Sequence, residues 1–144
     1  MLNPRIIPCL LVQYKGLVKT VKFSSPKYVG DPLNAVKIFN EKSVDELIVL
    51  DIDATNKQRE PDFKMIENLA MECRMPLCYG GGVNNKDQAL RIFELGVEKI
   101  AISSAALENP KIISEIAGMV GNQSIIVILD VKKKKFRKGY NLYT

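Results

Sequence analysis

Short apolar runs alternate with longer amphipathic stretches along this chain. The runs cover residues 5–12, 46–52, 76–80, 99–103 and 124–130 and are rich in Ile, Leu and Val. Continuous apolar runs of this length are typical of strands that are buried on both faces of a parallel sheet. The pattern therefore predicts five parallel strands.

The stretches between the runs have a helical period and predict four helices, at about residues 31–42, 61–73, 86–95 and 109–120. The first and the fourth begin with an Asx-Pro pair, which suits a helix N-terminus. The third stops at Gly96, a natural left-handed cap. A longer loop, residues 13–30, follows the first strand, and loops of that length are often functional.

Unbroken alternation of strands and helices predicts right-handed crossovers and an α/β fold. We expect a parallel β/α barrel of the TIM-barrel type, here a partial barrel of about five strands and four helices, as a single domain over residues 1–144. Four and a half β/α units cannot close an eight-stranded barrel. The sheet is therefore either open in its own right or part of a longer chain.

Charged and polar residues mark both ends of the predicted strands. Arg5, Glu46 and Lys99 each open an apolar run, so we expect them to meet at the amino-terminal rim. The other ends carry Gly80-Gly81-Gly82, Ser103-Ser104 and Asp130. Because ligands bind at the carboxyl ends of parallel strands, this second rim is the candidate active site.

The composition narrows the chemistry. The chain has no histidine, which excludes Ser-His and Cys-His nucleophile pairs within it and removes the commonest metal ligand. Its three cysteines lack metal-ligand spacing, and their odd number argues against a disulfide framework. We expect no metal and no cofactor, so catalysis by this chain would rest on carboxylates, lysines, hydroxyls and backbone amides.

The net charge of +5 is concentrated in one segment. Lys132 to Lys135, Arg137 and Lys138 supply six positive charges, so the other residues sum to −1. This segment predicts a solvated loop or hairpin, or a means of attracting an anionic substrate, whereas a nucleic-acid surface would be spread over a face with stacking aromatics. No run approaches a membrane span and no secretory signal precedes the first strand, so we expect a cytoplasmic protein.

Several motifs together resemble the cyclase subunit of imidazole glycerol phosphate synthase, a lyase of histidine biosynthesis. They are Arg-Ile-Ile-Pro-Cys-Leu at 5–10, Asp-Glu-Leu-Ile-Val-Leu-Asp-Ile at 45–52, Gly-Gly-Gly-Val at 80–83, Lys-Ile-Ala-Ile-Ser-Ser-Ala-Ala-Leu-Glu-Asn-Pro at 99–110 and Ile-Leu-Asp at 128–130. The resemblance implies the first half of an eight-stranded barrel plus its fifth strand. It implies three partners: a glutaminase subunit, a phosphorylated or nucleotide-linked substrate, and the remainder of the barrel.

In that family, ammonia from the glutaminase enters the bottom of the barrel and reacts at the top. Arg5, Glu46 and Lys99 match three members of the family's ammonia gate, although a plain salt-bridge layer remains an alternative. The glycines Gly81 and Gly82 and the serines Ser103 and Ser104 match a phosphate site. For the glycines the alternative is a tight turn.

Side chains alternate along a strand, so the residues that share a face with the rim charges can be counted. If Arg5, Glu46 and Lys99 point inward, the same face holds Cys9, Leu11, Leu50, Ser103 and Asp130. Asp130 matches one of the family's two catalytic aspartates. Asp51 falls on the other face, which suits a structural partner for a loop, and Asp53 is left undecided.

The family's second catalytic aspartate falls at residue 11, which here is Leu11. Lys19 is retained where the family has its loop lysine. Leucine cannot transfer a proton, and the segment from Leu10 to Phe23 resembles cyclase-like paralogues of surface-polysaccharide (lipopolysaccharide-type) clusters, which help convert a sugar amino group to an acetamidino group. We weigh that paralogue above the histidine cyclase, a related sugar isomerase and a non-catalytic half-barrel assembly module.

Overall fold

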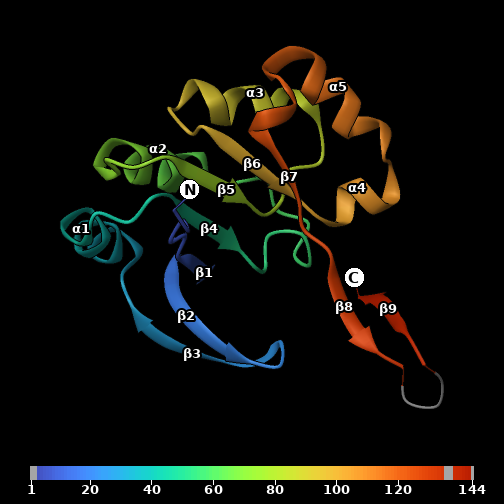
Figure 1. Ribbon diagram of the computed structural model, residues 1–144, viewed down its shortest axis with the longest axis horizontal. Coiled ribbons are helices and arrows are strands. Elements are labelled where there is room, and N and C mark those ends of the chain that lie inside the picture. The colour runs from blue at the N-terminus through green and yellow to red at the C-terminus, as the bar shows by residue number, and fades with distance from the viewer. Residues whose placement is uncertain (1–2, 135–137, 144) are drawn as a thin grey trace.

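The fold is built on a curved sheet of seven strands, in the order β3-β2-β1-β4-β5-β6-β7 (Figure 1). The computed structural model describes residues 3–134 and 138–143. Five strands run parallel: β1 (Cys9–Gln13), β4 (Leu47–Asp51), β5 (Leu77–Gly80), β6 (Lys99–Ile102) and β7 (Ile125–Val127). They correspond to the five predicted strands, and they lie side by side in chain order. The result is a partial TIM-type barrel.

The helices lie over one face of this sheet (Figure 1). They are α1 (Pro32–Lys42), α2 (Phe63–Glu72), α3 (Lys86–Glu94), the short α4 (Ser104–Glu108) and α5 (Lys111–Val120). Asp31, Asp62 and Asn85 cap the first three, because each side-chain oxygen accepts a hydrogen bond from a backbone N–H of the first turn. Gly96 follows α3 with a φ of 96°, as its position predicts.

The fourth predicted helix is present, but its predicted start is wrong. Asn109 does not cap α5, because α4 occupies residues 104–108 and the Asn109 N–H donates to the Ala105 carbonyl. The helix begins at Lys111, and Pro110 takes the capping position without a side-chain bond. The sequence pattern did not predict α4, which ends two residues before this proline.

The core lies between the sheet and its helices. Its fully buried members alternate along the strands and follow the inner stripes of the helices: Val12, Val49, Tyr79, Ile100, Ile102, Ile66, Leu69, Ile92 and Ile116. No helix in residues 3–134 and 138–143 is long and apolar enough to cross a bilayer.

Two antiparallel hairpins depart from the predicted pattern. Residues 13–30 are not a loop, because β2 (Gly16–Val21) and β3 (Ser24–Gly30) pair with each other and β2 pairs with β1. The predicted fifth strand also ends early, at Val127. Asp130 instead begins β8 (Asp130–Lys133), which pairs with β9 (Tyr140–Tyr143) in a separate two-stranded ribbon. A short 3-10 turn, η1 (Asn122–Ser124), precedes β7.

The first strand is shorter than predicted because prolines flank its start. Pro4 and Pro8 cannot donate ladder hydrogen bonds, and the regular strand begins at Cys9. The preceding segment still runs beside the start of β4: the Asp45 N–H donates to the Ile6 carbonyl at 3.1 Å, and the Ile48 N–H donates to the Pro8 carbonyl at 2.9 Å. This extension places Arg5 at the amino-terminal rim.

Candidate functional site

Three charged side chains converge at the amino-terminal rim. Arg5 Nη2 lies 3.1 Å from Oε2 of Glu46, and Lys99 Nζ lies 2.7 Å from both carboxylate oxygens. Glu46 is only 1% exposed, although it directly precedes a strand. A carboxylate this buried is stable only with cationic partners, and here one comes from each side of it.

Above these charges the open face of the sheet is apolar. Strand register aligns Cys9, Ile48 and Cys78 with Lys99 in one layer. The next layer holds Leu11, Leu50, Gly80, Ala101 and Ile126. A Cβ on Gly80 would meet both Leu50 and Ala101 at under 3 Å, so these side chains lie side by side. This is the face that the alternation predicts for Leu11 and Leu50.

Cys78 is a packed thiol in this face. Burial, followed by the negative charge of Glu46, raises the pKa of Cys78 to about 12. The thiol therefore stays protonated at neutral pH and fills space as an apolar group.

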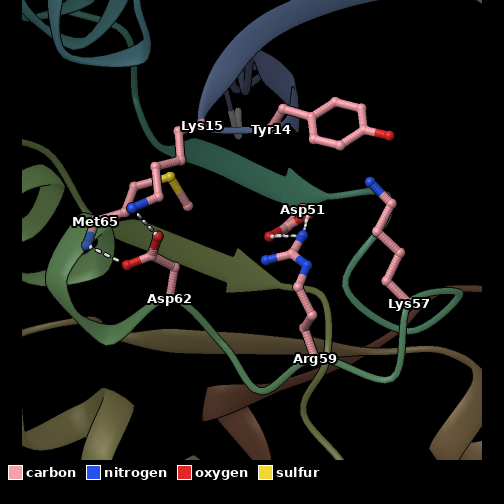
Figure 2. A pocket seen from close by; sticks show the side chains of 7 residues that line it. All are labelled: Tyr14, Lys15, Asp51, Lys57, Arg59, Asp62 and Met65. Atoms are coloured by element: carbon pink, nitrogen blue, oxygen red, sulfur yellow. Dashed lines mark hydrogen bonds and ion pairs between the residues drawn. The ribbon is translucent and has the colours of Figure 1, made fainter.

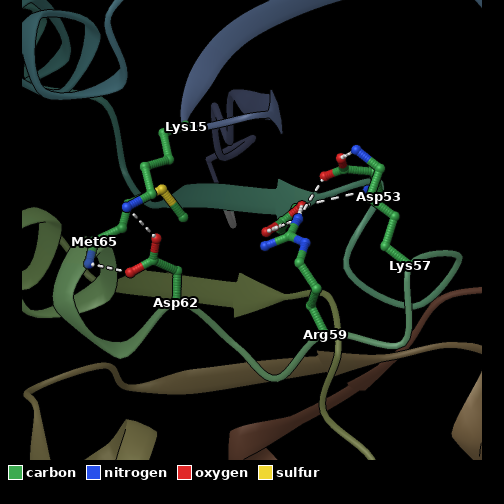
Figure 3. A network of polar contacts seen from close by, with 7 residues as sticks. Lys15, Asp53, Lys57, Arg59, Asp62 and Met65 are labelled. Atoms are coloured by element: carbon green, nitrogen blue, oxygen red, sulfur yellow. Dashed lines mark hydrogen bonds and ion pairs between the residues drawn. The ribbon is translucent and has the colours of Figure 1, made fainter.

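A second charged cluster occupies the carboxyl end of β4, on the helix-covered side (Figure 3). Arg59, from the β4–α2 loop, places Nη2 2.8 Å from Oδ1 of Asp53 and 3.4 Å from Oδ2 of Asp51. Lys57 Nζ lies 2.6 Å from the other Asp53 oxygen, and the Asp53 N–H donates to Asp51. Asp51 thus binds the loop that follows its own strand, as expected from its position on the face opposite the rim charges. Asp53 belongs to the same network.

Burial, hydrogen bonds and neighbouring charges together give the two carboxyl groups different acidities. It raises the pKa of Asp51 to about 6, aided by the hydrogen bond with Asp53. Burial alone would also raise the pKa of Asp53, but hydrogen bonds with Asp51 and Lys57 and the charge of Arg59 lower it below its ordinary value. The pair therefore carries about one negative charge near pH 5 and two near pH 7.

The β1–β2 turn closes over this cluster and forms a cavity of about 370 Å³ (Figure 2). Tyr14 and Lys15 make the turn, both with positive φ. Lys57 Nζ lies 3.2 Å from the centre of the Tyr14 ring, and Lys15 Nζ lies 3.3 Å from Oδ2 of Asp62. Asp62 also caps α2 by accepting from the Met65 N–H. The turn is therefore fixed to the β4–α2 loop at two points.

The glycines after β5 pack against the protein itself. Gly81 has a φ of 117°, and a Cβ there would come within 2.3 Å of the Asp51 carbonyl oxygen. A Cβ on Gly82, with a φ of 73°, would lie 2.8 Å from the Arg59 carbonyl oxygen. These contacts explain why both positions are glycine, in line with the tight-turn alternative, and they leave the phosphate role of Gly81 and Gly82 a prediction.

The predicted serines follow the next strand. Ser103 sits at the start of α4 without a capping hydrogen bond from its side chain, and Ser104 is the first helical residue. Both are partly exposed and follow the carboxyl end of β6, as predicted.

Lys19 and Asp130, the two predicted catalytic residues, lie on different hairpins. Lys19 is exposed in β2, opposite Lys27, and Asp130 begins β8, opposite Tyr143. The hairpins extend from opposite edges of the sheet, so the described structure does not bring the two residues together.

Sequence reasoning missed Lys57, Arg59 and Asp62. The Asp51-Ile52-Asp53 pair at a strand end was a usable signal for a cationic partner nearby. Nothing in the spacing of the β4–α2 loop singled out Arg59.

Residues 5–142 match the family model described as histidine biosynthesis protein. The chain belongs to this family. Members share the TIM-barrel fold, which agrees with the partial barrel described above. Since the match covers nearly the whole chain, the family assignment applies to the sheet, the hairpins and both charged clusters.

Curated relatives refine this family assignment. The chain is 61% identical over 144 residues to a Vibrio vulnificus (strain YJ016) protein provisionally named imidazole glycerol phosphate synthase subunit hisF3, of which it covers 55%. It is 51% identical over 144 residues to a Pseudomonas aeruginosa protein provisionally named subunit hisF2, covering 57%. A Lactococcus lactis subunit HisF is 38% identical over 143 residues, with 55% covered. The chain thus spans about half the length of the curated relatives it matches.

Proposed function

We propose that this chain is the amino-terminal part of an ammonia-accepting, cyclase-type subunit that works with a glutaminase. The observation that carries the proposal is buried Glu46, bound by Arg5 at 3.1 Å and Lys99 at 2.7 Å at the amino ends of the strands. Because Glu46 has two cationic partners, the contact with one can open while the other keeps the buried carboxylate paired.

The open face above the cluster suits neutral ammonia. From Lys99 toward the carboxyl ends of the strands, the register layers hold thiols and aliphatic side chains, and burial raises the pKa of the Cys78 thiol. Such a surface offers ammonia no group that would protonate it. The cluster would then admit ammonia from the partner and the apolar face would lead it to the carboxyl ends.

The acceptor in this proposal is a nucleotide-linked sugar with an N-acetylated amino group, which becomes an acetamidino group in surface-glycan biosynthesis. The ammonia nitrogen replaces the acetamido carbonyl oxygen, which leaves as water. Leu11 supports this choice, because it lies beside Leu50 where a second acid would be needed for cyclisation. The 51–61% identity to the numbered relatives, against 38% to the Lactococcus lactis subunit HisF, also supports it. Gly81, Gly82, Ser103 and Ser104 would bind a phosphate, and Asp130 and Lys19 would act on the acceptor.

A histidine-pathway cyclase is the second candidate. It is favoured by the retention of Asp130 and Lys19, the only two groups with proton-transfer chemistry among the predicted catalytic positions. The two candidates differ in whether the reaction can proceed with Asp130 as the single acid, or needs a second acid at position 11.

Rescue of a bacterial strain that lacks the histidine cyclase tests the choice. We expect no rescue by the full-length protein that carries this half, even with an active glutaminase, and weak rescue at best by its Leu11→Asp variant. Efficient rescue by the unmodified protein would reverse the assignment in favour of the histidine cyclase. Leu50→Asp, at the neighbouring position of the same layer, is the matched control.

A further inference from the structure

Tyr28 is an exposed aromatic residue on the open face of the sheet. Strand register places it opposite Val18 of β2, and Val18 lies opposite Leu11 of β1. Directly paired residues point to the same side of a sheet, so Tyr28 shares the face of Leu11. One row without a charged side chain therefore crosses all seven strands: Tyr28, Val18, Leu11, Leu50, Gly80, Ala101 and Ile126.

A contact with Gly16 fixes the height of the Tyr28 ring on this face. A Cβ on Gly16 would lie 2.9 Å from both Cδ2 and Cε2 of Tyr28, so the ring rests where a side chain would otherwise stand. Gly16 pairs with Gln13, the last residue of β1. The ring therefore lies at the carboxyl end of β1, the rim at which parallel sheets bind their ligands.

Most of this ring is free. Tyr28 is 68% exposed in spite of its contact with Gly16. In the part of the chain that the structure describes, the two cation–π contacts use the rings of Tyr14 and Phe63, so no cation covers Tyr28. A planar ring that is held along one edge and exposed elsewhere can stack on a planar group of a ligand.

The charge of the β2–β3 hairpin suits a phosphorylated ligand. Residues 16–30 contain Lys19, Lys22 and Lys27, all exposed, and no Asp or Glu. Lys27 directly precedes Tyr28 and pairs with Lys19 across the two strands. Lysine ammonium groups bind phosphate as point charges. The hairpin thus combines a flat ring with cations and carries no group that would repel a phosphate.

The spacing between Tyr28 and Leu11 fits a ligand with a base at one end and a sugar at the other. From β3 to β1 is two strand spacings, roughly 10 Å. In a nucleotide-linked sugar, ribose and phosphate groups separate the base from the sugar. A base on Tyr28 would therefore leave the sugar free to reach Leu11 and the carboxyl ends of the central strands.

We propose that Tyr28 stacks on the nucleobase of the nucleotide-linked acceptor and that the hairpin lysines contact its phosphates. This inference rests on the proposed function for the class of acceptor, and it adds the residue that recognises the base. Tyr28 would then determine that the acceptor carries a nucleotide. The alternative is a tyrosine that only covers Gly16.

Direct binding of nucleotides to the full-length protein separates the two. We would measure dissociation constants by isothermal titration calorimetry for AMP, CMP, GMP and UMP, and for ribose 5-phosphate, which lacks the base. Tyr28→Leu keeps an apolar contact with Gly16 but has no ring, and Tyr28→Phe keeps the ring. Tyr140→Leu is the matched control, because Tyr140 is 67% exposed on the β8–β9 ribbon. Circular dichroism establishes that all four proteins are folded.

We expect the tightest of the four nucleotides to bind about tenfold or more tightly than ribose 5-phosphate, because stacking of a base on an aromatic ring strengthens binding. Tyr28→Leu should lose most of this ratio, whereas Tyr28→Phe and Tyr140→Leu should keep it within about twofold. An unchanged ratio in Tyr28→Leu would overturn the proposal. So would an equal loss in Tyr140→Leu, or a wild-type protein that does not prefer any nucleotide over ribose 5-phosphate.

This titration needs neither the glutaminase nor turnover, so its outcome is separate from rescue of the strain that lacks the histidine cyclase. Absence of rescue with an unchanged ratio in Tyr28→Leu would leave the proposed function standing and overturn the role of Tyr28. Efficient rescue with a lost ratio in Tyr28→Leu would reverse the proposed function and support Tyr28 as the residue that binds a base.

Discussion

Lys99 Nζ lies 2.7 Å from both carboxylate oxygens of Glu46, although strand β5 runs between the strands that carry them. The lysine side chain therefore crosses the open face over Cys78, its register partner in β5. Arg5 reaches Glu46 from the side of β1. One buried carboxylate thus ties together the amino ends of β4 and β6 and the segment before β1.

Removal of the lysine should destabilise the fold. Lys99→Met leaves Glu46 buried with only the half-exposed Arg5, and we expect the free energy of unfolding to fall by about 1–3 kcal/mol. Urea denaturation measures the change, with Lys86→Met, an exposed lysine of α3, as the control. An equal effect of the two substitutions would mean that Glu46 does not need Lys99.

The glycine loop gives a second stability test. Gly81→Ala requires positive φ in a residue with a Cβ and brings that atom within 2.3 Å of the Asp51 carbonyl oxygen, so we expect a loss of about 3 kcal/mol or more. Gly118→Ala, in α5 with open space around it, should instead stabilise by up to about 1 kcal/mol. Thermal melts of both variants check the pair, and similar melting temperatures would show that the close approach is absent.

Asp51 predicts a pH dependence of stability. Its pKa of about 6 in the folded protein lies above the ordinary value of 3.8, so the native state binds this proton more tightly than the unfolded chain does. The contribution of Asp51 to the free energy of unfolding is therefore full below about pH 4 and is lost as the pH rises through about 6. Asp53, whose pKa is lowered, acts the opposite way, and its contribution is lost only as the pH falls below about 4.

Asp51→Asn should remove the decline between pH 4 and pH 6. Urea unfolding at pH values from 4 to 7 should show the wild type losing on the order of 2 kcal/mol relative to this variant across that range. Asp87→Asn, an exposed acid of α3, should run parallel to the wild type. Parallel curves for Asp51→Asn would contradict the raised pKa.

The parallel strands and outer helices were predictable because apolar runs and helical stripes are local patterns. The hairpins were not. The β2–β3 turn uses Lys22 and Phe23 at positive φ, where a sequence signal would need Gly or Asn. The alternation of side chains along β7 would place Asp130 on the same face as Ile126. Its own strand, β8, instead pairs with β9, and that pairing is decided by residues further along the chain.

The candidate site was predictable in part for the same reason. Arg5, Glu46 and Lys99 each stand at a strand start, so a parallel sheet must bring them together. Arg59 and Lys57 sit in an irregular loop whose path depends on contacts with Asp51, Asp53 and Tyr14. No periodic pattern reports such contacts.

Transfer of nitrogen from glutamine tests the ammonia gate most directly. The full-length protein, its glutaminase and the nucleotide-linked sugar with its N-acetylated amino group would react with glutamine labelled with ¹⁵N at the amide, in excess unlabelled ammonium chloride. We expect the wild-type product to keep the ¹⁵N label, and the Lys99→Met product to take up unlabelled nitrogen while its rate with ammonium alone is retained. Equal labelling in the two proteins would contradict the assignment of Arg5, Glu46 and Lys99 as a gate for ammonia.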